Sequence, residues 1–113
     1  MNIEAFKKLI EHYEANAPEH WGYTHCATGA IVKLDMHQSG DFDTFLGLDN
    51  LNYRRLIYAT NDPDRIRMHG RLEYVHAGQT PETNQQNVLG MLRRAVASGD
   101  GHIEWKHETR NVA

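Results

Sequence analysis

Apolar residues near the start of the chain recur at three- and four-residue spacing, which predicts a helix with one buried face. Asn2 is a residue type that caps helix starts, and Glu4 suits the positive end of a helix dipole. Pro18 disfavours helical geometry at Ala17, so we expect the helix to break within residues 16–22. The residues expected on its buried face are Ile3, Phe6, Leu9, Ile10 and Tyr13.

The clearest helical pattern covers residues 80–97. Thr80 is a good N-cap, and Pro81 fits the first helical position because proline lacks an amide hydrogen. Arg93 and Arg94 complement the negative C-terminal end. The residues expected on its buried side are Val88, Leu89, Met91, Leu92, Ala95 and Val96.

Two further helical regions are expected between these. One starts at Thr24 as N-cap and runs to about Gln38, with Gly40 as a left-handed cap after its end. The other lies within residues 41–60, and Gly47 divides it into a short turn and a longer helix. The expected core residues are Cys26, Ala27, Ala30, Ile31 and Leu34 in the first region, and Phe42, Phe45, Leu46, Leu48, Leu51, Leu56 and Ile57 in the second.

Two stretches alternate polar and apolar residues, which is typical of strands. Residues 65–76 do so on both sides of Gly70 and predict a β-hairpin, and residues 102–107 predict a short C-terminal strand. The chain shows no internal repeat and no evident linker. We therefore predict one α+β domain over residues 1–113, mainly helical with about four helices, a β-hairpin and a short C-terminal strand.

Composition narrows the class of protein. The chain has 113 residues and a net charge of −3, so no basic excess supports non-specific binding to nucleic acid or membrane. Its one cysteine cannot form an internal disulfide. The N-terminal segment lacks the apolar core and cleavage site of a signal peptide, and no apolar run approaches the roughly 20 residues that span a bilayer. We expect a soluble, cytoplasmic protein.

Cys26 is the sharpest candidate for chemistry, and His25 lies beside it. A cysteine in the first turn of a helix lies near the positive end of the helix dipole, which stabilises the thiolate. The thiolate is the nucleophile of cysteine hydrolases. The candidates for the base are His76 and His69, and those for the group that orients it are Asn61 and Asp62. Helical spacing favours the other interpretation, in which Cys26 shares a buried face with Ala30 and Leu34.

A zinc site is an alternative at the same turn. His20, His25 and Cys26 surround it, and zinc binds nitrogen and sulfur ligands that converge in a tetrahedron. The chain has no Cys-x-x-Cys pair and no His-Glu-x-x-His helix. Solvated histidines and no cofactor are the favoured interpretation.

A binding surface is predicted in the expected hairpin. Arg65 and Arg67 project to one face of it, near Arg71 and Tyr74, and suit a phosphate or an acidic protein. For the arginines taken alone, the favoured interpretation is a solvated, charged strand face that discourages edge pairing. Trp21 either anchors its loop in the core or lines a pocket beside the cysteine.

Three short motifs resemble a family of small uncharacterised proteins of bacteriophages and actinobacteria. They are Cys-Ala-Thr-Gly-Ala-Ile at residues 26–31, Asn61-Asp62, and the end of the last helix around Arg94-Ala95-Val96. The chain departs from the family in its arginine-rich segment, residues 64–79. The resemblance implies a phage or mobile-element origin, but it gives no activity that could be assigned to this chain. One structural role for the Asn-Asp pair is to accept hydrogen bonds from the amides that start the Cys26 helix.

These features favour a binding module without enzymatic activity: a small phage-type accessory protein that binds, and thereby inhibits, a host or viral macromolecule. A protein partner is favoured over nucleic acid, no membrane partner is expected, and a homodimer is left open. Two alternatives remain. One is a cysteine- or metal-dependent hydrolase centred on Cys26 and the histidines, and the other is a protein that sequesters a small ligand near Trp21.

Overall fold

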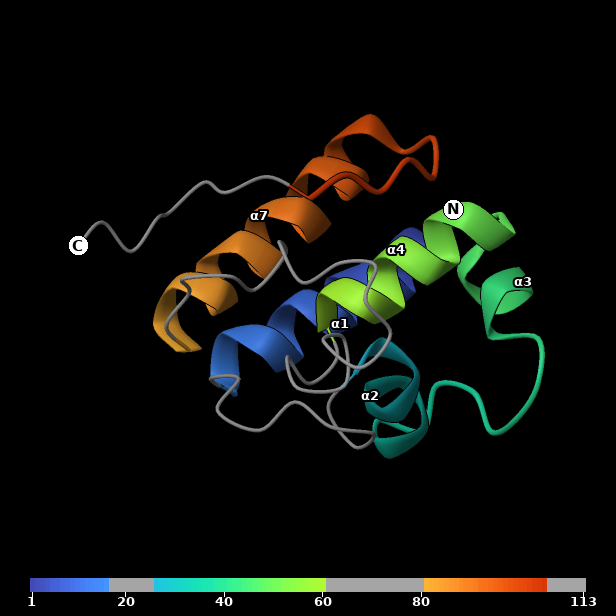
Figure 1. Cartoon of the computed structure of the whole chain (residues 1–113). Helices are drawn as coiled ribbons and strands as arrows, with labels where there is room; N and C mark the ends of the chain where they lie inside the picture. Colours follow the sequence, from blue (N-terminus) through green and yellow to red (C-terminus); the bar gives the residue numbers. More distant parts are fainter. Residues whose placement is uncertain (17–25, 61–80, 106–113) are drawn as a thin grey trace.

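The structure, a computed structural model, describes residues 1–16, 26–60 and 81–105, apart from the side chains of residues 81–84. Within these ranges every regular element is a helix (Figure 1). The helices, labelled as in Figure 1, are α1 (Ile3–Ala15), α2 (Ala27–Lys33), α3 (Phe42–Leu46), α4 (Asn50–Thr60) and α7 (Pro81–Ser98). None of them combines the length and apolar character that a membrane span requires.

The predicted α+β class is wrong, because the described residues form helices and no strand. Residues 102–105 do alternate, with Ile103 buried between exposed His102 and Glu104, but they pair with no other strand among the described residues. Alternation indicates that a segment has one buried and one exposed face. Here side chains of helices, rather than a neighbouring strand, hold the segment in that position. The predicted hairpin at residues 65–76 lies outside the described residues.

The α1 and α7 helices form the centre of the core, where they pack against each other. Their apolar faces match the two clearest periodic patterns of the sequence, so both helix predictions are confirmed. Each large buried apolar side chain contributes about 1.5–3 kcal/mol relative to an exposed one. The fully or nearly fully buried apolar side chains of the pair are those of Ala5, Phe6, Leu9, Tyr13, Val88, Leu89, Met91, Leu92 and Ala95.

The α2 helix ends with a left-handed residue, Asp35, whose φ is 60°. The Asp35 amide donates to the Val32 carbonyl and the Met36 amide donates to the Ile31 carbonyl, both at 3.0 Å. This pair of bonds is the Schellman arrangement, and Met36 and Ile31 sit at the positions that usually make its apolar contact. Glycine is the common residue at the left-handed position, so an aspartate there is unusual.

Three expectations for the middle of the chain have definite outcomes. The α2 helix ends at Lys33 rather than near Gln38, and Gly40 is left-handed (φ 68°) without capping it. Leu34 and Leu51 are 40% and 56% exposed, so their predicted place in the core is wrong. The expected division of residues 41–60 is confirmed, since α3 and α4 are separate helices.

Asn2 joins the start of α1 to the end of α3. Its side-chain oxygen accepts the Ala5 amide at 3.2 Å, which confirms the predicted N-cap. Its side-chain nitrogen donates to the Phe45 carbonyl at 3.0 Å, and its main-chain amide donates to the Leu46 carbonyl at 2.8 Å. One residue therefore satisfies an amide at the start of α1 and two carbonyls at the end of α3.

This junction requires glycine at position 47. Gly47 has a φ of 69°, and a Cβ atom there would lie 2.9 Å from the Met1 Cα atom. Gly47→Ala is expected to lower the free energy of unfolding by roughly 2–4 kcal/mol, from left-handed strain and from a clash with main-chain atoms.

Gly40→Ala is the matched control, because Gly40 has nearly the same φ (68°) and a Cβ atom there would meet no atom within 4 Å. It is expected to cost only the left-handed strain, about 1 kcal/mol. Urea unfolding measures both variants. Equal losses would show that the approach of Met1 to Gly47 is not a constraint.

Candidate functional site

Cys26 lies in the core at the start of α2. It is the N-cap residue, its carbonyl accepts the Ala30 amide at 2.8 Å, and its side chain is 5% exposed. The thiol makes no capping hydrogen bond to the helix. The position agrees with the buried interpretation that helical spacing favours, although Leu34 does not share that buried face. The prediction of Thr24 as the N-cap of this helix is wrong, because α2 begins at Ala27 with Cys26 as its N-cap.

The other residues singled out in the sequence lie outside the described residues. They are His20, Trp21, His25, Asn61, Asp62, Arg65, Arg67, His69, Arg71, Tyr74 and His76. Within the described ranges no three His, Cys, Asp or Glu side chains lie close enough to hold a metal ion. The hydrolase, zinc and arginine-surface hypotheses therefore stay predictions.

The first amide of α2 is satisfied by Thr60, at the end of α4. The Ala27 amide donates to the Thr60 hydroxyl oxygen at 2.9 Å, and the hydroxyl donates to the Leu56 carbonyl at 2.9 Å. The sequence suggests Asn61 and Asp62 for this role, and the residue that performs it directly precedes them. Threonine is a known capping residue type. Sequence reasoning misses Thr60 because it caps a helix that lies far from it in the chain.

Tyr13 of α1 completes this buried hydroxyl network, which we define as Tyr13, Thr60 and the Ala27 amide. Tyr13 and Thr60 are fully buried. Burial raises the pKa of Tyr13 well above its ordinary value, a hydrogen bond with Thr60 opposes this only in part, and Cys26 adds to the rise. The phenol thus stays neutral and serves as a hydrogen-bonding group that ties α1 to α2 and α4.

Thr60→Val tests the network. Valine keeps the shape but leaves the Ala27 amide buried without an acceptor, so we expect a loss of about 2–3 kcal/mol in the free energy of unfolding. Thr60→Ser keeps the hydroxyl and removes one methyl group, with an expected loss of about 1 kcal/mol. Urea unfolding distinguishes them, and a serine variant as unstable as the valine variant would count against the hydroxyl as the stabilising group.

The burial of Cys26 predicts slow chemical modification. Iodoacetamide should label the thiol at least about tenfold more slowly in the folded protein than in urea, because reaction requires local opening. Mass spectrometry after timed quenching gives both rates. Labelling of the folded protein at the rate of an unhindered thiol would contradict the buried position and revive the nucleophile hypothesis.

A second feature lies on the outside of the helices, where residues 34–41 connect α2 to α3 (Figure 1). Asp35 and Asp41 have φ angles of 60° and 48°, and they are the only residues other than glycine with positive φ in the described ranges. Such conformations cost free energy and persist where the surroundings enforce them. The presence of both in one short connection marks it as a strained segment.

His37 holds the connection against α3. Its ring stacks on Phe45 with centroids 4.9 Å apart and meets the edge of Phe42 at 5.1 Å. Its Nε2 atom donates to the Gly40 carbonyl at 2.7 Å. Sequence reasoning misses this packing role because it treats histidine as a metal ligand or a solvated residue. The contact gives the strained segment a defined shape.

The exposed residues in and just before this connection include apolar and acidic groups. Val32 and Leu34 are each 40% exposed. Residues 34–53 contain four aspartates and no lysine or arginine. We call Val32, Leu34, Asp35, His37 and Asp41 the α2–α3 surface. Exposed Lys33 lies between the two apolar residues in sequence, so the charges here are mainly but not only acidic. Large exposed apolar side chains beside a mainly acidic segment are typical of surfaces that bind proteins.

Comparison of the chain with protein-family models, with curated proteins and with solved structures found no match. The resemblance to small phage proteins stays a prediction.

Proposed function

We propose that the chain is a binding module without enzymatic activity, and that the α2–α3 surface binds a protein partner that presents basic side chains around an apolar contact. The observation that carries the proposal is that Val32 and Leu34 are exposed beside a connection, residues 34–41, whose charged residues are Asp35 and Asp41; exposed Lys33 is the one basic residue next to them in sequence. Burial of the apolar side chains contributes affinity, while the aspartates favour basic partners and disfavour acidic ones.

The shape of the surface supports this role. The Schellman bonds hold Asp35 in place, and the stacked ring of His37 holds the following residues against α3. The side chain of Gln38 also donates to the Asp35 carboxylate at 2.8 Å. A surface already ordered before binding loses less conformational entropy on association than a flexible loop does.

The resemblance to small phage proteins favours a host or phage protein as the partner, with inhibition as the result. Contact through Arg65, Arg67 and Arg71, which lie outside the described residues, is a separate prediction. It concerns acidic or phosphorylated partners, whereas the α2–α3 surface concerns basic ones.

The test is a comparison of three tagged proteins in a host lysate: wild type, the double variant Val32→Lys/Leu34→Lys, and Leu51→Lys as control. Leu51 is an exposed leucine on α4 outside the α2–α3 surface (56% exposed), so its variant controls for loss of an apolar side chain and gain of charge. Wild type and Leu51→Lys should recover the same partner, and the double variant about tenfold less, because it removes apolar contact and adds repulsion.

Binding of the purified partner should also weaken as salt rises, because exposed charges are screened. Equal recovery by all three proteins would contradict the proposal, as would binding that salt leaves unchanged.

A further inference from the structure

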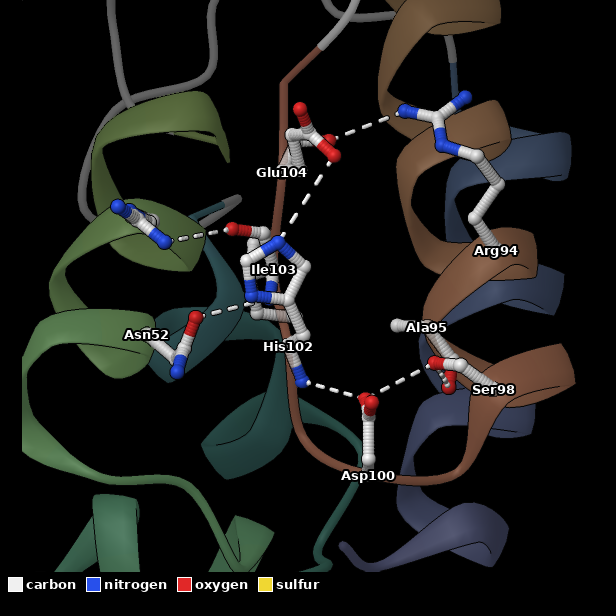
Figure 2. Close-up of polar contacts among 9 residues, drawn as sticks. Asn52, Arg94, Ala95, Ser98, Asp100, His102, Ile103 and Glu104 are labelled. Atoms are coloured by element: carbon white, nitrogen blue, oxygen red, sulfur yellow. Dashed lines mark hydrogen bonds and ion pairs between the residues drawn. The ribbon is translucent and has the colours of Figure 1, made fainter.

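After α7 the chain turns back and lies between α4 and α7 (Figure 2). The reversal uses two left-handed glycines, Gly99 (φ 70°) and Gly101 (φ 80°). Between them the Asp100 carboxylate accepts the His102 amide at 3.0 Å and the Ser98 hydroxyl at 3.1 Å. We call residues 101–105 the strap.

The strap is held by side chains that bind its main chain. Asn52 of α4 accepts the Ile103 amide at 2.8 Å, and Arg55 of α4 donates to the Ile103 carbonyl at 3.3 Å. Arg94 of α7 donates to the Glu104 carbonyl at 3.0 Å. Figure 2 shows these contacts reaching the strap from the helices on its two sides.

One side chain anchors the strap. Ile103 is fully buried and belongs to the hydrophobic core, whereas His102 and Glu104 are exposed and approach each other to 3.8 Å. The α4 and α7 helices thus hold this segment by its main chain and by one aliphatic side chain, and we call the place between them where the strap lies the groove. Peptide-binding grooves recognise extended segments by the same combination.

We propose that this groove also accepts the strap of a second copy of the chain, so that the protein forms a homodimer by exchange of straps. The proposal is independent of the α2–α3 surface. The segment in the groove is the chain's own, so the identical segment of another copy makes the same contacts there. Exchange of an identical element needs no new interface and is a low-cost route to dimers.

The turn from Gly99 to Gly101 decides whether the strap binds its own chain or a second copy. A short connection gives the strap an effective concentration of about millimolar order at its own groove. Wild-type protein should therefore be monomeric at micromolar concentration and should dimerise toward the millimolar range. A substitution that strains the closed turn destabilises the monomer and not the dimer. The reason is that the turn is closed in the monomer and has to open when the straps are exchanged.

Gly99→Val is the test variant and Gly40→Val its matched control. Both glycines have φ near 70°, and a Cβ atom at either position would meet no atom within 4 Å, so the Cβ atom of each valine strains the local turn without contacting a neighbour. Strain that disfavours the closed turn about tenfold in each chain is relieved twice in a dimer, which lowers the dimer dissociation constant about a hundredfold, to roughly 10 μM. Gly40→Val should leave dimerisation unchanged.

Light scattering coupled to size-exclusion chromatography measures the mass of each protein across a concentration series. The dimer of Gly99→Val should be lost in Gly99→Val/Ile103→Ser, because serine removes the aliphatic anchor. A Gly99→Val protein that stays monomeric, or a dimer that survives Ile103→Ser, overturns the proposal.

Sedimentation equilibrium of the wild type up to about 2 mM does not depend on the folding of any variant. Dimer should appear at the upper end of that range and should be absent in Ile103→Ser. Wild-type protein that is monomeric throughout overturns the proposal even if Gly99→Val fails to fold.

Discussion

The packing of α2 against α1 and α4 depends on the hydrogen bonds of the Thr60 hydroxyl group. This group accepts the Ala27 amide, donates to the Leu56 carbonyl and hydrogen-bonds Tyr13, so a single buried atom connects the three helices. The α2 helix has seven residues, which is too short for stability in isolation. Its buried first amide needs an acceptor, because a buried amide without one costs free energy comparable to a lost hydrogen bond.

Other short segments are also fixed to the helices by hydrogen bonds between their main-chain groups and polar groups elsewhere in the chain. The five-residue α3 receives two hydrogen bonds at its C-terminal end from Asn2, and the strap is bound by Asn52, Arg55 and Arg94. In both cases polar groups from another part of the chain, among them the main-chain amide of Asn2, hydrogen-bond main-chain groups that have no partner within a long helix or a sheet. The two long helices supply the apolar core, and these polar side chains fix the short segments to it.

This division explains which features the sequence predicts. The α1 and α7 helices follow from apolar periodicity and from local signals such as Asn2 and Pro81, because the residues that stabilise them are near one another in the chain. The conformation of residues 102–105 depends on partners far away in sequence. Their alternation is genuine, but the groups that bind their main chain are on helices, and no local pattern records that. The candidate site was predictable to a similar extent: helical spacing places Cys26 in the core, where the structure has it, whereas Thr60 and the ring packing of His37 act on elements that local patterns do not connect to them.

The residue that ends α2 bears on function. A left-handed cap is expected at Gly40 because glycine adopts that conformation at least cost, but the capping residue is Asp35. Asp35 places a negative charge beside the negative C-terminal end of α2, in a conformation that glycine or asparagine would adopt at lower cost. Asp41 precedes α3 at the N-cap position, yet it is left-handed and its side chain makes no capping bond. Asp35 thus occupies a position where folding alone favours another residue type, whereas aspartate is a common residue at an N-cap and its charge suits the positive end of α3. The cost at Asp35, beside exposed Val32 and Leu34, is the physical reason to place the proposed binding function on the α2–α3 surface rather than at Cys26.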